Sequence, residues 1–203
     1  MKRYLLLITV AVLGLSATQV ATAQNDEKRK ATREQWHRDM EEFRQRSAAE
    51  RSQEREINAA KGRSASNALE ARSFVFETES ISFNNGPTLF VNSHVNFISL
   101  NDSRAVVQIS PSNFAPGDNG VGGITVDGMP TDMSYDVDDK GKITFSMSVM
   151  GRNINASVII DMVEGSDVAH ATIKPNFGAN RTIWMKGKVV PYEASSVYEG
   201  MSR

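Results

Sequence analysis

The regular alternation of apolar and polar residues in the second part of the chain constrains its fold more than any other feature. In the clearest segment, Ile143, Phe145, Met147 and Val149 alternate with polar residues. A period of two places alternate side chains on opposite faces of an extended strand, so that one face is apolar. The alternation begins near Ser73 and predicts strands over residues 74–83, 89–100, 104–110, 123–127, 133–137, 142–150, 153–163, 168–174 and 181–190.

Turn-forming residues separate these predicted strands. Two examples are the segments Asn84-Asn85-Gly86-Pro87 and Asp138-Asp139-Lys140-Gly141. Short strands that recur every 8–12 residues or so favour an antiparallel arrangement over parallel βαβ units. We therefore expect an all-β body of about eight or nine strands over residues 73–192, with a C-terminal tail at 193–203. The expected architecture is an antiparallel meander that forms a sandwich or a strongly curved open sheet.

The first 23 residues have the order of a secretory signal peptide. Lys2 and Arg3 are followed by an apolar run and then by Ala21-Thr22-Ala23, an A-x-A cleavage signal. The apolar run is about a dozen residues long, whereas a membrane-spanning helix needs about 20. We expect a mature chain that starts at Gln24, has no membrane span, and is located in the periplasm or outside the cell.

A charged segment lies between the signal peptide and the predicted strands. Residues 25–72 hold 12 Lys or Arg and 10 Asp or Glu, without proline, which predicts a long helix. We expect a charged helical arm over residues 24–62 and, because Gly62 and several serines follow, a linker over 63–72. Trp36, Met40 and Phe43 share one face of this helix. The arm is therefore either a charged spacer or a helix that docks, through these three residues, onto its own body or onto another chain.

Composition argues against several classes of chemistry. The chain has no cysteine, which excludes disulfides, thiolate metal sites and thiol catalysis. The three histidines, His37, His94 and His170, are far apart in the sequence, and neither His94 nor His170 has a carboxylate or a second histidine at the spacing of a metal-ligand pair. A net charge of -1 leaves no uncancelled positive face for nucleic acid. We therefore expect no metal, no cofactor, no nucleic acid partner and no catalytic residues, with an unrecognised hydrolase as the least favoured reading.

Two loops resemble ligand sites in composition only. The acidic segment that starts at Asp136 lacks the glutamate of a calcium loop, since Met147 stands at its twelfth position, so we expect a hairpin turn. The glycine-rich segment 116–123 precedes a strand and not a helix, which argues against a phosphate cradle. It favours a mobile loop or a bend before an edge strand, with a binding loop as the alternative. Phe114 precedes this loop, and Trp184 is out of phase with its apolar neighbours. Both are candidate interaction residues.

Several segments together resemble a known family. They are Pro111 with Phe114 ahead of the glycine-rich run, Gly122–Gly128, Tyr135-Asp136, Ala169–Ile173 and Ile183–Val189. Over residues 73–192 the chain resembles the secreted Bacteroidetes proteins of the domain-of-unknown-function family DUF4251. The resemblance implies an exported, mainly β protein, and it supplies no activity and no catalytic residues.

These observations favour an exported, non-enzymatic binding or interaction module that uses the arm and the glycine-rich loop to contact a protein partner. The alternative is a carrier that holds a small apolar ligand in the concave face of the sheet, lined by Phe and Met side chains. An internal cavity would favour the carrier, whereas a filled core and an exposed Trp36 stripe would favour the interaction module. The sequence leaves the oligomeric state open.

Overall fold

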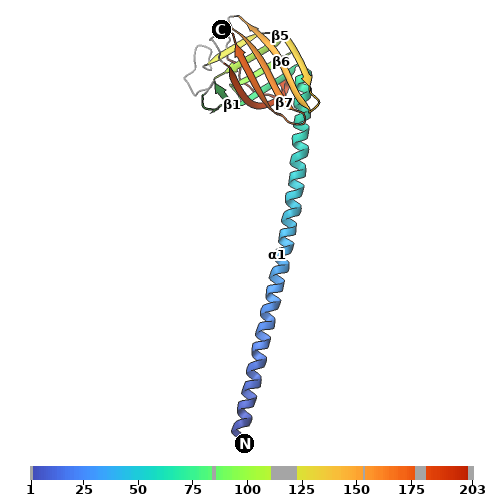
Figure 1. Ribbon diagram of the computed structural model, residues 1–203, viewed down its shortest axis with the longest axis vertical. Helices are drawn as coiled ribbons and strands as arrows, with labels where there is room; N and C mark the ends of the chain where they lie inside the picture. Colours follow the sequence, from blue (N-terminus) through green and yellow to red (C-terminus); the bar gives the residue numbers. More distant parts are fainter. Residues whose placement is uncertain (1, 84–85, 111–122, 153, 177–181, 201–203) are drawn as a thin grey trace. The chain divides into compact units, whose positions relative to one another are not determined.

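The computed structural model describes residues 2–83, 86–110, 123–152, 154–176 and 182–200, and it describes side chains from Glu27 onward. Within the described residues, a helix, nine strands and one 3-10 turn follow one another. Figure 1 shows the course of the chain through them. They are α1 (Lys2–Glu70), β1 (Ser73–Phe83), β2 (Leu89–Phe90), β3 (Phe97–Asn101), β4 (Arg104–Ile109), β5 (Ile124–Val137), β6 (Lys142–Gly151), β7 (Asn155–Val163), β8 (Val168–Pro175), β9 (Ile183–Pro191) and η1 (Tyr192–Ala194). The chain divides within α1 into two units, Met1–Glu54 and Arg55–Arg203.

Eight of the nine strands form a closed antiparallel barrel. Neighbours in the barrel follow the chain order from β1 and β3 through β9, and β9 pairs with β1 to close it. The short strand β2 is additional and pairs with β1 at Ser80 and Ile81. The all-β body is thus confirmed, but the expected sandwich or open sheet is wrong. The alternation specifies which face of each strand is apolar, and it carries no information on whether the first and last strands meet.

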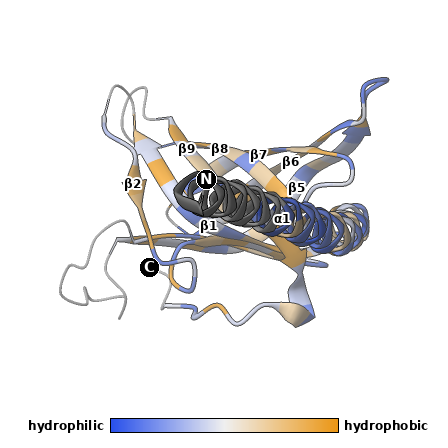
Figure 2. Cartoon of the chain, turned by 90° about the horizontal axis from the view of Figure 1, so that it is seen from below, coloured by the Kyte–Doolittle hydropathy of each residue, from blue (hydrophilic) through white to orange (hydrophobic). Residues whose placement is uncertain are grey.

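The barrel interior is filled by the apolar face that the alternation predicts. Along β6, Ile143, Phe145, Met147 and Val149 are buried, and the residues between them are at least partly exposed. The rings of Phe74 and Phe145 meet edge to face, with centroids 5.2 Å apart. Hydrophobic residues recur along the barrel strands, whereas α1 is mostly hydrophilic in the part that is coloured (Figure 2).

The last turns of α1 belong to the barrel's core. Ala65 and Leu69 are fully buried and join the same apolar cluster as Phe74. A Cβ on Gly62 would lie 2.1 Å from the carbonyl carbon of Gly165, in the turn between β7 and β8. We expected a linker over residues 63–72, but the helix continues to Glu70. Gly62 permits the close approach of two backbones and does not end the helix.

Two expected strand boundaries also change. The expected strand 89–100 divides into β2 and β3, and the expected strands 123–127 and 133–137 merge into β5. An irregularity in the pairing of β5 with β6, near Asp132 with its φ of 52°, allows the merged strand to continue. The turn at Asp138 is confirmed as a hairpin, because the carboxylate of Asp138 accepts hydrogen bonds from the backbone N–H of Lys140 and Lys142, both at 2.8 Å.

Candidate functional site

The predicted apolar stripe of the arm is exposed in the first unit. The side chains of Trp36 and Phe43 are 56% and 66% exposed, and Met40 is half-buried against its own helix. Elsewhere this part of the helix presents charged side chains, among which Glu42 and Arg46 form an ion pair at 3.4 Å. Two large rings in contact with water on a charged helix are unfavourable unless another surface covers them.

Among the described residues, no helix is long and apolar enough to cross a membrane.

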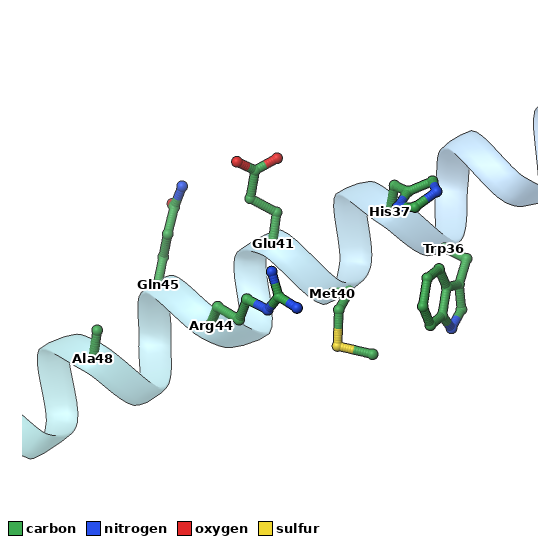
Figure 3. A pocket seen from close by; sticks show the side chains of 7 residues that line it. All are labelled: Trp36, His37, Met40, Glu41, Arg44, Gln45 and Ala48. Atoms are coloured by element: carbon green, nitrogen blue, oxygen red, sulfur yellow. The ribbon is translucent and has the colours of Figure 1, made fainter.

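A shallow groove of about 570 Å³ runs along the helix beside the stripe. Figure 3 shows Trp36 and Met40 on one side of the ribbon, with Glu41 and Gln45 directed to the other. Rows of side chains four residues apart form the ridges of a helix, and the grooves between them receive the ridges of a packed neighbour. The groove is therefore suited to another helix. Its lining residues are Trp36, His37, Met40, Glu41, Arg44, Gln45 and Ala48.

In the second unit, a polar cluster lies on the outer face of the barrel. The Asp161 carboxylate accepts hydrogen bonds from Lys142 Nζ and Thr144 Oγ1, both at 2.8 Å, and His170 is its cross-strand neighbour. Partial burial opposes the ionisation of Asp161. The hydrogen bonds from Lys142 and Thr144, with the charges of Lys142 and His170, outweigh this and lower its pKa below the ordinary value. A carboxylate held in this way is a weak base.

A concavity of about 570 Å³ adjoins this cluster, and the exposed Val163 and Val168 contribute to its lining. Its rim carries both acidic and basic side chains, so it has no strong preference for one sign of charge. Among the described residues, no three His, Asp or Glu side chains come together as a metal site would require.

Trp184 lies on the outer face of β9, as the phase of its neighbours predicts. Its side chain is 44% exposed, whereas Ile183 and Met185 are buried. It pairs across the sheet with Thr172 on β8 and with Ser82 on β1. Its described cross-strand partners on both sides are therefore polar.

The C-terminal segment, residues 192–200, forms a strap over β3 and β4 that the sequence did not predict. The fully buried side chain of Gln108 donates to the carbonyl of Tyr198 at 2.9 Å and accepts from the N–H of Gly200 at 2.8 Å. Val197 packs against a small cluster that includes Val75 and Phe97. A glutamine inside the apolar run of β4 was the available signal, since a buried amide needs partners.

A charged contact also holds the strap. The Arg104 guanidinium donates to the Asp127 carboxylate at 2.8 and 3.0 Å and pairs with Glu199 of the strap. Hydrogen bonds to Asp127 and Glu199 raise the pKa of Arg104 above its ordinary value. Residues 193–200, the described part of the expected C-terminal tail, thus lie against the outer face of the barrel.

The structure brings together only part of the predicted interaction set. Trp36, Met40 and Phe43 form one stripe in the first unit, and Trp184 stands alone in the second. Phe114 and most of the glycine-rich loop lie outside the described residues.

The comparisons with known proteins agree with the fold. The family model described as a domain of unknown function, DUF4251, matches residues 56–189. The chain is similar to a crystal structure of a DUF4251 family protein from Bacteroides eggerthii, with 37% sequence identity and a TM-score of 0.61. The similarity covers 70% of this chain and 94% of that one. No curated protein matches the chain. The match spans both the end of α1 and the barrel strands, and the chain belongs to the DUF4251 family.

Proposed function

We propose that this protein is an exported, non-enzymatic interaction module whose helical arm binds a protein partner. The observation that carries the proposal is the exposed stripe of Trp36, Met40 and Phe43 on a helix that is otherwise charged. Aromatic side chains at protein interfaces contribute large apolar areas, and they are frequent among the residues that dominate binding energy. A partner that covers the stripe would remove the rings of Trp36 and Phe43 from water.

The packing of the barrel interior supports an interaction module over a carrier. Eight-stranded barrels have an interior that either is filled by side chains or holds one small ligand. Here Phe74, Phe76 and Phe145 are fully buried inside one continuous cluster. The polar cluster at Asp161 gives little support for a catalytic base, because the hydrogen bonds from Lys142 and Thr144 to Oδ1 favour the ionised carboxylate and make it a weak base.

Export is supported by the order of charged, apolar and small residues before Gln24. The test is intact-mass analysis of protein recovered from the periplasm or the medium of the producing cells. We expect a chain that begins at Gln24. Recovery of a chain that retains Met1–Ala23 would contradict export with cleavage.

The binding proposal is tested by photo-crosslinking in the producing cells. A benzoylphenylalanine is placed at Phe43 in one variant and, as a matched control, at Arg38, which lies on the opposite side of the same helix and lines neither groove. We expect a crosslinked product from position 43 and little from position 38. Equal products, or none from position 43, would contradict the proposal. Mass spectrometry of the product identifies the partner.

A further inference from the structure

The interaction stripe of the arm continues beyond its three apolar residues at the same heptad spacing. Before Trp36 the same face carries Arg29 and Arg33, and after Phe43 it carries Ser47, Glu50 and Glu54. Residues that alternate three and four apart stay on one side of a helix, with a slow drift that a left-handed supercoil corrects. The stripe is thus basic at one end, apolar in the middle and acidic at the other end.

We propose that this stripe pairs with the same stripe of a second copy of the chain, as an antiparallel two-helix coiled coil. The inference rests on the proposed function, because it names the partner of the arm. In this alignment Met40 faces the second copy's Phe43, and Trp36 faces the second copy's Ser47. Arg33 and Arg29 then face the second copy's Glu50 and Glu54. Because the pairing is symmetric, each of these contacts occurs twice.

Charge decides the direction of the two helices. In the antiparallel pair all four charged contacts of the stripe join opposite charges. In a parallel pair the same residues would face themselves, arginine against arginine and glutamate against glutamate, and like charges at that spacing repel. At the flanking positions Asp39 attracts the second copy's Arg46, and Lys30 repels the second copy's Arg51. These two flanking effects oppose each other, so the stripe sets the direction.

Side-chain size agrees with the same alignment. Trp36 is the largest residue of the stripe, and its facing residue, Ser47, is the smallest. Large and small side chains that face each other allow two helices to interlock without voids. Grooves beside the stripe are present from Lys28 to Ala48, which is most of the stretch from Arg29 to Glu54 that a second helix would occupy. The arm has net charge close to zero over residues 27–54, so overall repulsion between copies is small.

Charge reversal tests the pairing. The mass of the full chain is measured by sedimentation over a range of concentrations. We expect a dimer that Glu50→Arg with Glu54→Arg weakens by roughly a hundredfold, because four attractive contacts become repulsive. Adding Arg29→Glu and Arg33→Glu to the same chain should restore dimerisation. Glu27→Arg with Glu34→Arg is the matched control, since it changes the charge equally on another face that lines neither groove and should have little effect.

Cysteine crosslinking tests whether the two helices are antiparallel. Because the chain has no natural cysteine, only the introduced cysteines can form disulfides. When a chain with Arg33→Cys is mixed with a chain with Glu50→Cys, the antiparallel pair should give mixed disulfides upon oxidation. Neither chain alone should crosslink, because like positions would lie about 25 Å apart at 1.5 Å per residue. Efficient crosslinking of each chain with itself would overturn the antiparallel assignment.

The failure of this inference is distinguishable from failure of the proposed function. A full chain that is monomeric at about 100 µM, a concentration at which even weak interfaces associate, overturns the pairing. If such a chain also gives a position-specific crosslink from Phe43 to a different protein, the proposed function stands and only its partner changes. If there is neither a dimer nor a crosslink, both are wrong.

Discussion

Replacing Gly62 by alanine should destabilise the barrel, although the same change in an ordinary helix would stabilise it. At an exposed helix interior, Gly→Ala gains about 1 kcal/mol. Here the new Cβ would lie 2.1 Å from the carbonyl carbon of Gly165 and 2.5 Å from the N of Ser166, and both are backbone atoms. Contacts this short force the helix and the turn apart. Forced overpacking typically costs about 1–3 kcal/mol, and contacts this short with backbone atoms favour the middle to upper part of that range. After the helix gain is subtracted, we expect a net loss of about 1–2 kcal/mol.

Urea unfolding followed by tryptophan fluorescence measures this loss in the second unit. The chain has two tryptophans, so Trp36→Phe leaves Trp184 on β9 as the only reporter. At a slope of about 2 kcal/mol/M, the middle of the typical range, the midpoint should fall by about 0.5–1 M. Ser64→Ala, on an exposed face of the same helical turn, is the control and should shift the midpoint little.

A second control separates contact from backbone conformation. Gly165 has a φ of +79° and nothing within 4 Å of an added Cβ. Gly165→Ala should therefore lower stability by about 1–2 kcal/mol through backbone strain alone. If Gly62→Ala instead raises the midpoint, as it would in a free helix, then the end of α1 is not seated on this turn, and the reasoning from close approach is wrong.

Three other outcomes follow from the packing and the ion pair. Deleting residues 24–54 should leave the unfolding of the barrel cooperative and its free energy of unfolding nearly unchanged. Extending the deletion through Leu69 should lower that free energy by roughly 3 kcal/mol or more, because buried side chains of α1 are lost. Loss of cooperativity upon the shorter deletion would place the arm in the core. Phe145→Ala should lower the free energy of unfolding by about 3–5 kcal/mol and create a site for a benzene-sized probe. Binding of that probe by the unaltered chain would contradict a filled interior. The pKa of Asp161 is lower in the folded chain than in the unfolded chain, where it is about 3.9. The stability that Asp161 contributes is therefore fully present above the unfolded pKa, and it is lost as the pH falls through the folded pKa. Urea midpoints of Asp161→Asn and the unaltered chain should therefore converge in acid, and a constant difference would refute the assignment.

Most of the strands could be predicted because their signal is local. The expected strands at 142–150 and 168–174 agree with β6 and β8 within one residue. Alternation specifies a buried face from a few adjacent residues, without knowledge of the partner strand. The same locality explains why closure was missed, since the pairing of Phe74 with Pro191 through Phe83 with Ile183 joins the two ends of the body.

The role of Gly62 and the strap were missed for a related reason. In isolation, a glycine followed by serines weakens a helix, but the contact between Gly62 and Gly165 depends on residues far apart in the chain. The strap has no periodicity, and individual contacts hold it, among them the hydrogen bonds to Gln108 and the ion pair of Arg104 with Glu199. In the candidate site, the stripe could be predicted from its helical spacing. The cluster of Lys142, Asp161 and His170 could not, because it depends on the register of three neighbouring strands and on no local residue pattern.

The pairing of β1 with β9 has a consequence for how the chain reaches its native state. The strand that closes the barrel is the last to be synthesised, so β1 waits with one side unpaired until residues 183–191 are available. Contacts between such distant segments slow folding, because the intervening loop must lose its freedom first. A chain interrupted before Ile183 would keep two open strand edges, β1 and β8, and such edges recruit other chains. Premature termination near the C-terminus should therefore yield aggregates and not a smaller folded protein.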